Sequence, residues 1–577
     1  MKMYSVLMLA AALAAQAQTP PPGGGRGGRG QAQAIPNLSL RPTGSSLGTI
    51  RVGAADQKFW FGWHVAIPSA AFRQLTLSEA LAKSDTLVVT GVEASSTQRI
   101  SPEIPKPLDD RLQAGERAAM VRRLKELNQQ IFAYRIENLG GDEAARRQVF
   151  EFAKALNIPL IVTSAAPAGL ETLADEYGID VAFESRSDPT ALLASISGSK
   201  RLGVAADLDA WMRAGIAPTN GLGLVKDKLM EVSIRDINNA AVPGFFLAAY
   251  REDLKPLLIT VEAPSLGETY AGLEKSLTGF ERAMLPAMAA RVRAMLDTPA
   301  GQIRGPERLS PEMRKAIDDA APRKAIVTPK KPRKLLVTDI QMYSGHATIP
   351  HGNLMIELMG KYTGAFTPVF SNDLDLLKYP KIKEFDAIWL NNVCGMVYND
   401  PEVREGILRF VREGGGIGGH HAVTFSNNNW PEFTEMMGGW AGAHHTEKQV
   451  IKVDDPNSPL TKSFPSGSFP HTDEFYHFPM YSPYSREKQH ILLSLDVEKS
   501  DMATSGRFCA ECTRTDQDYG LAWIRTYGKG RTYFTPLGHT TDFYTNPMWT
   551  QHILAAIQYI LGDLDADATP SAKLVKK

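Results

Sequence analysis

Among the residues of this sequence, the histidines give the most direct indication of catalytic or metal-binding chemistry. Eleven of the 12 histidines follow residue 345, in the C-terminal half of the 577-residue chain. Imidazole can transfer protons near neutral pH or bind a transition metal. His420 and His421 follow the glycine-rich run 414–419, and His539 follows Gly538. Because glycine lets the backbone bend sharply and a ligand approach closely, we predict that the reactive pocket lies in this half.

In each of two pairs of adjacent histidines, the two side chains cannot both face the same pocket. In an extended segment, neighbouring side chains point to opposite faces, so only one of His420 and His421 can enter the site. The same holds for His444 and His445, between which the sequence does not choose.

Short apolar runs place other polar residues at strand ends. The run 334–339 predicts a buried strand, and His346 lies on the loop after it. The run 386–390 predicts a second strand that ends in Asn391 and Asn392. Open α/β sheets bind ligands at the carboxyl ends of their strands, so these residues are candidate substrate contacts.

Helical patterns alternate with these strands. Residues 353–362 and 401–413 have amphipathic helical spacing, and three glycines end the second helix. The glycine-rich turn then has the form of a nucleophile elbow, but His421 stands where serine or cysteine would be needed. We therefore do not expect acyl transfer through a covalent intermediate.

These motifs resemble those of the ThuA-like (trehalose utilisation) family over residues 334–563. They are DAIWLNN at 386–392, FVREGGGIGGHHA at 410–422, GGWAGAHH at 438–445, DEFYHF at 473–478 and GKGRTYFTPLGH at 528–539. The resemblance implies a flavodoxin-like or glutamine amidotransferase-like α/β sandwich that lacks the amidotransferase cysteine. It also implies action on a sugar or an oxidised keto-sugar.

The resemblance also implies a set of site residues. The catalytic candidates are His421, Asp473, Glu474 and His539. The substrate-binding candidates are His346, Asn391, Asn392, Trp430, His444 and His445. His421, His444 and His539 are also candidate ligands of a divalent metal, for which zinc, nickel and manganese suit imidazole and carboxylate donors.

The N-terminal half has a different pattern, with eight short apolar runs that alternate with helices between residues 51 and 297, and the first of these runs predicts a strand at 59–66. This pattern predicts a (β/α)8 TIM-type barrel, whose active face lies at the C-terminal strand ends. Acidic residues close several of the predicted strands, among them Glu184, Asp207 and Glu262. Converging carboxylates need a cation to offset their repulsion.

This half is similar to sugar-phosphate isomerase/epimerase barrels of the xylose-isomerase type, through VAFES at 181–185, GVAAD at 203–207, VSIRD at 232–236 and LITVE at 258–262. The resemblance implies a divalent metal on Glu184, Asp207 and Glu262. However, Ser233 stands where that family has a ligand histidine. The alternative is that the carboxylates are solvated or paired with arginines such as Arg135, Arg186 and Arg235.

The two ends of the chain and its composition indicate where the protein is located and which class of partner it can bind. Residues 1–17 have the pattern of a secretory signal peptide and 18–50 that of a flexible Pro/Gly-rich tether, so we expect a periplasmic or secreted protein. Residues 298–333 are predicted to be a linker and 564–577 a disordered tail. Lys plus Arg and Asp plus Glu both number 63, so no net charge attracts nucleic acid or an anionic membrane, and the expected partner, a neutral small-molecule carbohydrate, is permitted. No segment predicts a membrane span.

Three hypotheses of function follow. The first is a carbohydrate-processing enzyme, a hydrolase, lyase or isomerase, whose chemistry lies in the ThuA-like domain. The second is a non-catalytic carbohydrate-binding protein. The third is a divalent-metal sugar isomerase or epimerase that uses the N-terminal barrel. The sequence does not determine the oligomeric state.

Overall fold

The computed structural model describes residues 61–574, except 73, 88, 165–167, 255–256, 264–269, 343–345, 503–511 and the side chains of 443–445 and 270. The chain forms two compact units that divide between Ala290 and Arg291. The predicted signal peptide, 1–17, and tether, 18–50, lie outside the described residues.

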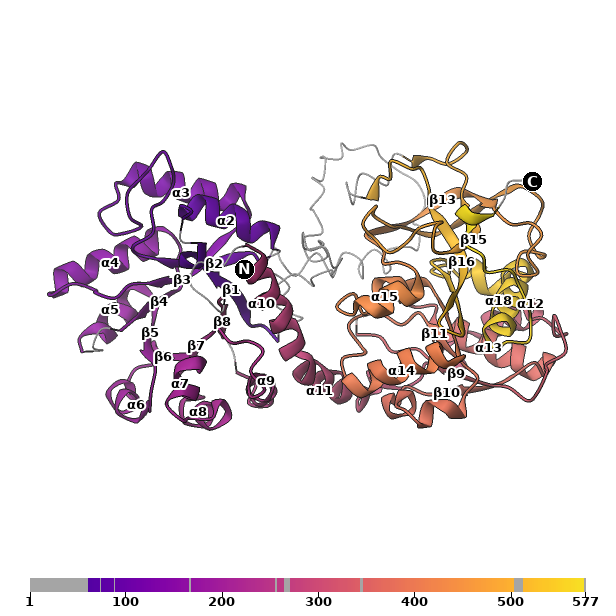
Figure 1. The fold of residues 1–577 in the computed structure, drawn as a ribbon, viewed down its shortest axis with the longest axis horizontal. Coiled ribbons are helices and arrows are strands. Elements are labelled where there is room, and N and C mark those ends of the chain that lie inside the picture. Colours follow the sequence, from indigo (N-terminus) through magenta and orange to yellow (C-terminus); the bar gives the residue numbers. More distant parts are fainter. Residues whose placement is uncertain are drawn as a thin grey trace. The chain divides into compact units, whose positions relative to one another are not determined.

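The N-terminal unit is a closed barrel of parallel strands, β1 to β8 in sequence order (Figure 1). The strands are β1 (His64–Pro68), β2 (Gly91–Ser95), β3 (Gln130–Arg135), β4 (Leu160–Thr163), β5 (Asp180–Ser185), β6 (Leu202–Asp207), β7 (Leu229–Ile234) and β8 (Leu258–Val261). The prediction of a (β/α)8 barrel is confirmed. The first predicted strand began five residues too early, at Phe59, because Phe61 and Gly62 adopt positive φ angles that no strand can accommodate.

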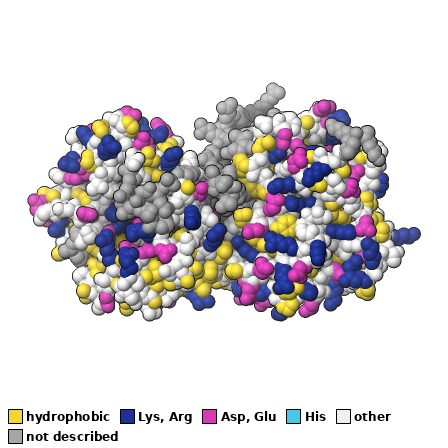
Figure 2. All heavy atoms as spheres, in the orientation of Figure 1, with side chains coloured by type: hydrophobic (Ala, Val, Ile, Leu, Met, Phe, Trp, Pro, Cys, Tyr) yellow, Lys and Arg dark blue, Asp and Glu magenta, His cyan; other side chains and the backbone are white. Residues whose placement is uncertain are grey.

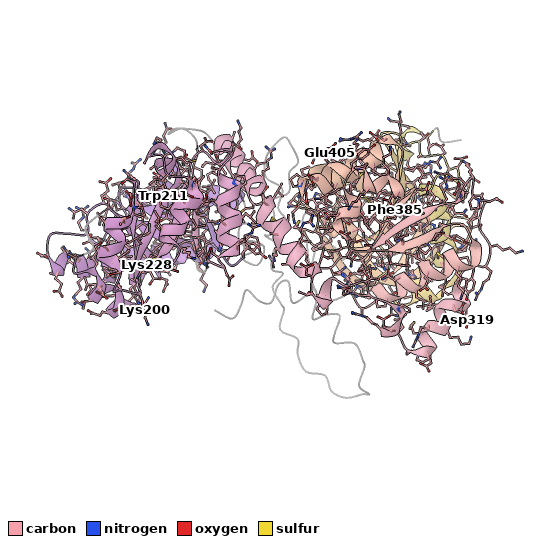
Figure 3. The ribbon with its side chains drawn as sticks, turned by 90° about the horizontal axis from the view of Figure 1, so that it is seen from below. Lys200, Trp211, Lys228, Asp319, Phe385 and Glu405 are labelled. Atoms are coloured by element: carbon pink, nitrogen blue, oxygen red, sulfur yellow. The ribbon has the colours of Figure 1, made fainter. Side chains whose placement is uncertain are left out.

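Helices surround the barrel, and small residues fill its interior. The helices are η2 (Ser69–Phe72), α2 (Leu77–Thr86), α3 (Ala114–Glu126), α4 (Glu143–Ala155), α5 (Leu170–Tyr177), α6 (Thr190–Ile196), α7 (Leu208–Arg213), α8 (Pro218–Val225), α9 (Val242–Arg251) and α10 (Tyr270–Ala283). Helix α11 (Leu285–Leu296) contains the division between the two units, and its Val292 joins a core of the C-terminal unit. Inside, Ala66, Ala133, Ala182 and Ala205 pack with larger side chains, including Phe132. Between barrel and helices, Trp211 is buried and donates its indole N–H to Ser185 (Figure 3).

The C-terminal unit is built on one mixed sheet of nine strands within the described residues, in the order β10-β9-β11-β12-β17-β16-β15-β13-β14. The strands are β9 (Lys334–Thr338), β10 (Thr367–Phe370), β11 (Ala387–Asn391), β12 (Gly416–His420), β13 (Ala443–Val453), β14 (Ser468–His477), β15 (His490–Leu495), β16 (Gly520–Tyr527) and β17 (Gly530–Thr535). Neighbouring strands pair in parallel from β10 through β9, β11 and β12 to β17. The other neighbouring pairs, from β17 through β16, β15 and β13 to β14, are antiparallel.

Both faces of the parallel half are buried, which explains its nearly continuous apolar strands. In β9, Leu335 and Val337 join one core, whereas Leu336 joins the other. Helices α12 (Pro311–Ala320), α13 (Ile349–Thr363) and α18 (Pro547–Ile560) cover the first face, and α14 (Pro401–Glu413) and α15 (Pro431–Met437) cover the second (Figure 1). The predicted α/β sandwich is confirmed.

Short helical turns complete this unit. They are η3 (Pro299–Gly301), η4 (Pro306–Arg308), η5 (Leu374–Leu377), η6 (Lys381–Glu384), η7 (His421–Phe425), α17 (Asp542–Thr545) and η10 (Ser571–Lys573).

The glycine-rich segment allows close packing of a helix on the central strand. A Cβ atom at Gly416 would lie 2.0 Å from the carbonyl oxygen of Ile560 in α18, so no larger residue fits there. The glycines therefore bring α18 against β12, whose last residue leads into the site.

The predicted linker and tail both contact the C-terminal unit. In the linker, α12 packs against α13, and Ile326 donates its backbone N–H to the side chain of Gln558. In the tail, the backbone N–H of Ser571 donates to Gln489. Prolines and charges alone did not indicate these contacts, because the two hydrogen bonds join residues more than 70 positions apart and the two helices are separate in sequence.

The surface carries interspersed charge. Lysine and arginine side chains alternate with aspartate and glutamate on the face that Figure 2 shows, in keeping with the equal totals of the sequence. Among the described residues, no helix is both long enough and apolar enough to span a membrane.

Candidate functional site

Three histidines from distant parts of the C-terminal unit converge. One ligand atom from each of His346, His421 and His539 lies within 4.8 Å of the other two. His539 Nδ1 is 3.1 Å from His421 Nε2, and the rings of His346 and His421 meet edge to face at 4.8 Å. Glu474 joins them, with its Oε2 atom 3.4 Å from His421 Nε2 and 3.3 Å from His539 Nδ1.

The parallel sheet explains the convergence. His346 follows β9, His421 follows β12 directly and His539 follows β17, so all three lie beyond carboxyl ends of parallel strands. β9 also lies where the chain order reverses, since β10 and β11 flank it on opposite sides. Such a switch point is the usual ligand site of an open α/β sheet.

His421 adopts a backbone conformation that is unusual for its type. Its φ angle is +60°, in the left-handed region, and its side chain is fully buried. A strained non-glycine residue persists only where its surroundings hold it, and such residues cluster at functional sites. The turn aims His421 into the cluster of His346, His539 and Glu474.

His420 points elsewhere and has a structural environment. Trp389 donates its indole N–H to His420 Nδ1 (3.2 Å), and His420 Nε2 lies 3.2 Å from the hydroxyl of Tyr544. Burial lowers the pKa of His420 to about 3, so the ring is neutral at physiological pH. The two adjacent histidines therefore divide between core and site, as predicted.

Asp473 and Glu474 also divide their roles. The buried carboxylate of Asp473 accepts hydrogen bonds from the backbone N–H groups of Gly538 (2.8 Å), His539 (2.9 Å) and Thr540 (3.1 Å). It thereby fixes the segment that carries His539. Glu474 is the member of the predicted acidic pair that faces the histidines.

A second set of contacts holds the same segment from its carbonyl side. Tyr544 and Thr348 both donate their hydroxyl groups to the carbonyl oxygen of Gly538, at 2.6 and 3.1 Å. Gly538 has φ +126°, and a Cβ atom there would lie 2.8 Å from the ring of His420. Glycine is therefore required immediately before His539.

The four groups have contrasting electrostatics. Burial, reinforced by the neighbouring His346 and His539, lowers the pKa of His421 well below its ordinary value. Burial alone would also lower the pKa of His539, but the hydrogen bond to Glu474 and the negative charges of Glu474 and Asp473 outweigh it and raise that pKa. Neighbouring imidazoles that differ in proton affinity suit acid and base roles.

Gln341 is a site residue that sequence reasoning missed. Its Oε1 atom lies 2.9 Å from His346 Nδ1, and its amide group donates to the carbonyl oxygen of Asn392. The available signal was its place two residues after the predicted strand 334–339, on the same edge as His346.

The structure places the remaining predicted contacts away from the three rings. Asn391 is fully buried and bonds to Asn353 (2.7 Å), and Asn392 lies beside His420. Trp430 is buried among core aromatic residues, stacked on Phe433. Their roles in binding stay predictions.

His444 and His445 lie on β13, opposite Tyr476 and Phe475 of β14. Their side chains are outside the described part of the structure, so the choice between them stays open. Tyr476 itself is buried, with its ring 5.3 Å from that of His421.

At the barrel rim, the predicted carboxylates are paired with arginines. The guanidinium of Arg135 contacts Glu93, Glu184 and, at 3.1 Å, Glu231. Glu184 also pairs with Arg186 (2.9 Å). The cation at the centre of these carboxylates is thus a side chain of the protein.

The other two barrel candidates are also engaged. Arg235 pairs with Glu262 at 2.7 Å, and Asp207 caps α7 by accepting the backbone N–H of Ala210 at 2.8 Å. The alternative of arginine pairing therefore describes this rim, and a metal on Glu184, Asp207 and Glu262 stays an untested prediction.

One proton is shared inside the barrel. Burial and the charge of Glu93 raise the pKa of Glu231 well above its ordinary value. Burial would raise the pKa of Glu93 as well, but the charge of Arg135 outweighs it and lowers that pKa. Glu93 is therefore the more acidic of the two groups, and Glu231 holds a proton more strongly than Glu93 does.

Comparison with known families decides what the C-terminal unit is. Residues 334–560 match the family described as ThuA, trehalose utilisation. This segment is a ThuA domain. The three histidines and Glu474 all lie within it, and its boundaries agree with the predicted resemblance. No curated protein matches the chain.

Solved structures resemble each part of the chain at low overall similarity. A ThuA-like protein from Bacteroides uniformis ATCC 8492 is 19% identical, with a TM-score of 0.34, and the match covers 43% of this chain and 97% of that one. An uncharacterized protein from Parabacteroides distasonis ATCC 8503 is 21% identical, with a TM-score of 0.34, over 38% and 98% of the two chains. A sugar phosphate isomerase/epimerase from the same organism is 10% identical, with a TM-score of 0.31, over 39% and 96%.

Proposed function

We propose that this protein is a carbohydrate-processing enzyme whose chemistry takes place in the ThuA domain. The observation that carries the proposal is the convergence of His346, His421, His539 and Glu474 from four segments of the chain. The family's description as trehalose utilisation supports a sugar or an oxidised keto-sugar as the substrate class.

The arrangement suits proton transfer. His421 Nδ1 faces the carbonyl oxygen of Pro536 at 3.2 Å. Because a carbonyl oxygen can only accept a hydrogen bond, Nδ1 carries the proton and Nε2 carries the lone pair. Nε2 can therefore take a proton from a sugar hydroxyl or from the carbon beside a keto group. Glu474 and His539 are placed to return a proton to the departing oxygen.

Asp473 is not the partner acid in this proposal. Its carboxylate is occupied by three backbone N–H groups of the 538–540 segment, so it acts by holding His539 in place. Glu474, on the adjacent position of β14, is the carboxylate available to the reacting groups.

The test is a product screen with the full-length chain. Trehalose, other glucosides and their keto derivatives are incubated with wild-type protein, His421→Ala and His64→Ala, and the products are identified by mass spectrometry. We expect turnover that His421→Ala reduces by about 10² to 10⁴, as for loss of a general acid or base, and that His64→Ala leaves intact. Ligand-induced thermal stabilisation without any product would instead indicate a binding protein.

For the barrel we propose a non-catalytic role in carbohydrate binding. The supporting observation is the pairing of Glu184 with Arg135 and Arg186, and of Glu262 with Arg235. Arginine does not lose its proton in proteins, so these groups suit hydrogen bonding to hydroxyl groups better than proton exchange. Loss of sugar-induced stabilisation in Arg235→Ala, with the ThuA domain unchanged, is the expected result.

We also propose that the chain is exported through residues 1–17. The support is one lysine, an apolar run and the Ala15-Gln16-Ala17 cleavage pattern. N-terminal sequencing of protein from the periplasm or medium should find Gln18 first. Recovery of an uncut chain from the cytoplasm would contradict export.

A further inference from the structure

We propose that His346, His421 and His539 form a three-histidine site for a divalent transition metal, with Glu474 beside the remaining coordination position. This inference rests on the proposed function and deepens it, because it concerns the same pocket: with an ion bound, His421 Nε2 would be a ligand, and Glu474 would replace it as the base that accepts the substrate proton. Among the described residues, these three are the histidine, cysteine or carboxylate side chains whose ligand atoms come close enough together to hold an ion.

The tautomer of His346 follows from its neighbour. The amide nitrogen of Gln341 donates to the carbonyl oxygen of Asn392, which fixes the amide orientation and leaves Oε1 facing His346 Nδ1. Oε1 can only accept, so Nδ1 of His346 carries the proton. The lone pair of a neutral His346 ring is therefore on Nε2.

His421 follows the same rule through a different acceptor. Its Nδ1 proton is directed to the carbonyl oxygen of Pro536, so its lone pair also lies on Nε2. Metal-binding histidines typically donate their other N–H to a carbonyl or amide oxygen, which fixes the tautomer and the ring orientation. Gln341 and Pro536 supply those two acceptors.

The spacing of two of the three donors, those of His421 and His539, fits a metal of the zinc type, and the donor of His346 lies within 4.8 Å of both. Two nitrogens bound to tetrahedral zinc at about 2.0–2.1 Å lie about 3.3 Å apart. The observed separation of His421 Nε2 and His539 Nδ1 is 3.1 Å. Two lone pairs at this distance repel unless a proton or a cation lies between them.

The donor set also has the composition of a catalytic site. Three protein nitrogens leave one position of a four-coordinate ion for water or substrate, as catalytic zinc sites do. Imidazole donors favour zinc, nickel, cobalt or copper over magnesium and calcium, which prefer oxygen. When bound, such an ion would polarise a substrate oxygen as a Lewis acid.

Glu474 adds the negative charge that such an ion requires nearby. Its Oε2 atom is 3.4 Å from one proposed ligand atom and 3.3 Å from another. The carboxylate can therefore take a proton from whatever occupies the fourth position. Asp473, by holding residues 538–540, keeps His539 within reach of the other two ligands.

The barrel offers a contrasting set of acidic groups. There, Arg135 already lies among Glu93, Glu184 and Glu231. A metal would have to displace a guanidinium that contacts three carboxylates. We therefore assign a single metal equivalent to the ThuA domain.

The experiment measures metal directly on the full-length chain, purified through a tag without histidine. Elemental analysis should find about one transition-metal ion per chain, or titration of the stripped protein with Zn²⁺ or Co²⁺ should reach one equivalent. Bound Co²⁺ should show the intense visible absorption of a four-coordinate ion. His346→Ala, His421→Ala and His539→Ala should each weaken binding at least 100-fold.

Two matched controls and one positioning variant sharpen the result. His64→Ala, in the barrel, and His490→Ala, whose ring contacts Asp455, should keep one equivalent. Gln341→Ala should bind 10- to 100-fold more weakly, because it frees the ring of His346 to turn. Circular dichroism excludes unfolding, and His346→Ala and His539→Ala are the least disruptive of the ligand variants, since both residues are only partly buried.

The outcomes separate this inference from the proposed function. A wild-type chain that binds less than a tenth of an equivalent of Zn²⁺ and Co²⁺, or variants that bind as wild type does, would overturn the metal site. If that chain still processes a sugar and His421→Ala does not, the proposed function stands without metal. If one metal binds and no sugar reacts, the metal site stands and the proposed function fails.

Discussion

The barrel rim and the ThuA site both collect ionisable side chains at the carboxyl ends of parallel strands, but they neutralise them differently. At the rim, Arg135 contacts Glu93, Glu184 and Glu231. In the ThuA domain, imidazoles meet one another and a single carboxylate, Glu474. The strand ends bring groups together in both places, and the residue types determine what the groups can do.

Arginine and histidine differ in whether the side chain can lose its proton and offer a lone pair. A guanidinium stays protonated and has no lone pair to offer, so the rim is a fixed network of ion pairs. Imidazole can gain or lose a proton near neutral pH and can bind a metal through nitrogen. The comparison assigns structural ion pairing to the barrel rim and reactive chemistry to the ThuA domain, and four experiments test it.

The largest effect is expected from Arg135→Met. Removing the guanidinium leaves the buried Glu93 and Glu231, whose side chains are 2% and 0% exposed, without their cation. Loss of one partner of a buried pair costs about 3–5 kcal/mol. Pulsed hydrogen exchange with mass spectrometry across a urea series should show that loss in barrel peptides alone. Arg186→Met, at a side chain that is 69% exposed, should cost under about 1 kcal/mol, and equal losses would refute the fixed network.

The second effect concerns acid stability of the ThuA domain. His552 is fully buried, bonded to Leu460 and Tyr533, and burial lowers its pKa to about 4. The unfolded chain, with a pKa near 6.5, binds more protons between pH 6.5 and 4, so stability is complete above pH 6.5 and falls as the pH drops toward 4. At about 1.4 kcal/mol per pKa unit, the loss approaches about 3 kcal/mol.

The same urea series at several pH values measures this loss in peptides of β17 and α18. His552→Gln, which keeps a donor for Leu460 and an acceptor for Tyr533, should remove most of the pH dependence between 4 and 6.5. An unchanged slope in that variant would assign the acid sensitivity to other groups.

A smaller effect is expected from Asp473→Asn. The substitution places an amide where a carboxylate accepts four backbone N–H groups, those of Glu474 and of residues 538–540, and an imperfectly satisfied buried donor costs about 1–3 kcal/mol. Because His539 then loses its fixed position, turnover should fall as well. Asp542→Asn, at a side chain that is 56% exposed, is the matched control and should leave both stability and turnover near wild type. Full turnover in Asp473→Asn would show that this carboxylate does not position the site.

The smallest effect should come from the barrel carboxylates. Glu184→Gln and Glu262→Gln should change turnover of the sugar identified in the product screen by less than about twofold, because both groups are tied to arginines in the present structure. Loss of turnover in either variant, with His421→Ala unaffected, would move the chemistry to the barrel and reverse the comparison.

The fold was largely predictable because its signals are local and repetitive. Eight apolar runs that alternate with amphipathic helices predicted the barrel, and the structure contains that barrel. Helix α14 runs over the predicted residues, from Pro401 to Glu413. The start of β1 was misplaced because the positive φ angles of Phe61 and Gly62 leave no mark in an apolar pattern.

The site was predictable in its members but only partly in its arrangement. His421, His539 and Glu474 were expected together, and they lie together. His346 was expected to contact substrate, whereas its ring lies against that of His421. Gln341 was not singled out at all, since a lone glutamine after a strand has no distinctive spacing.

The sequence by itself determined the two architectures, the half that carries the histidines, and that only one residue of the pair His420 and His421 enters the site. These depend on periodicity, residue type and the alternation of side chains along a strand, all of which are properties of neighbouring positions. Tertiary structure decided that Asp473 holds a backbone segment while Glu474 faces the rings, and that Arg135 lies among the barrel carboxylates. Those outcomes depend on contacts between atoms of residues that are tens to more than a hundred positions apart in the sequence. These contacts also determine the charge and the proton affinity of each group.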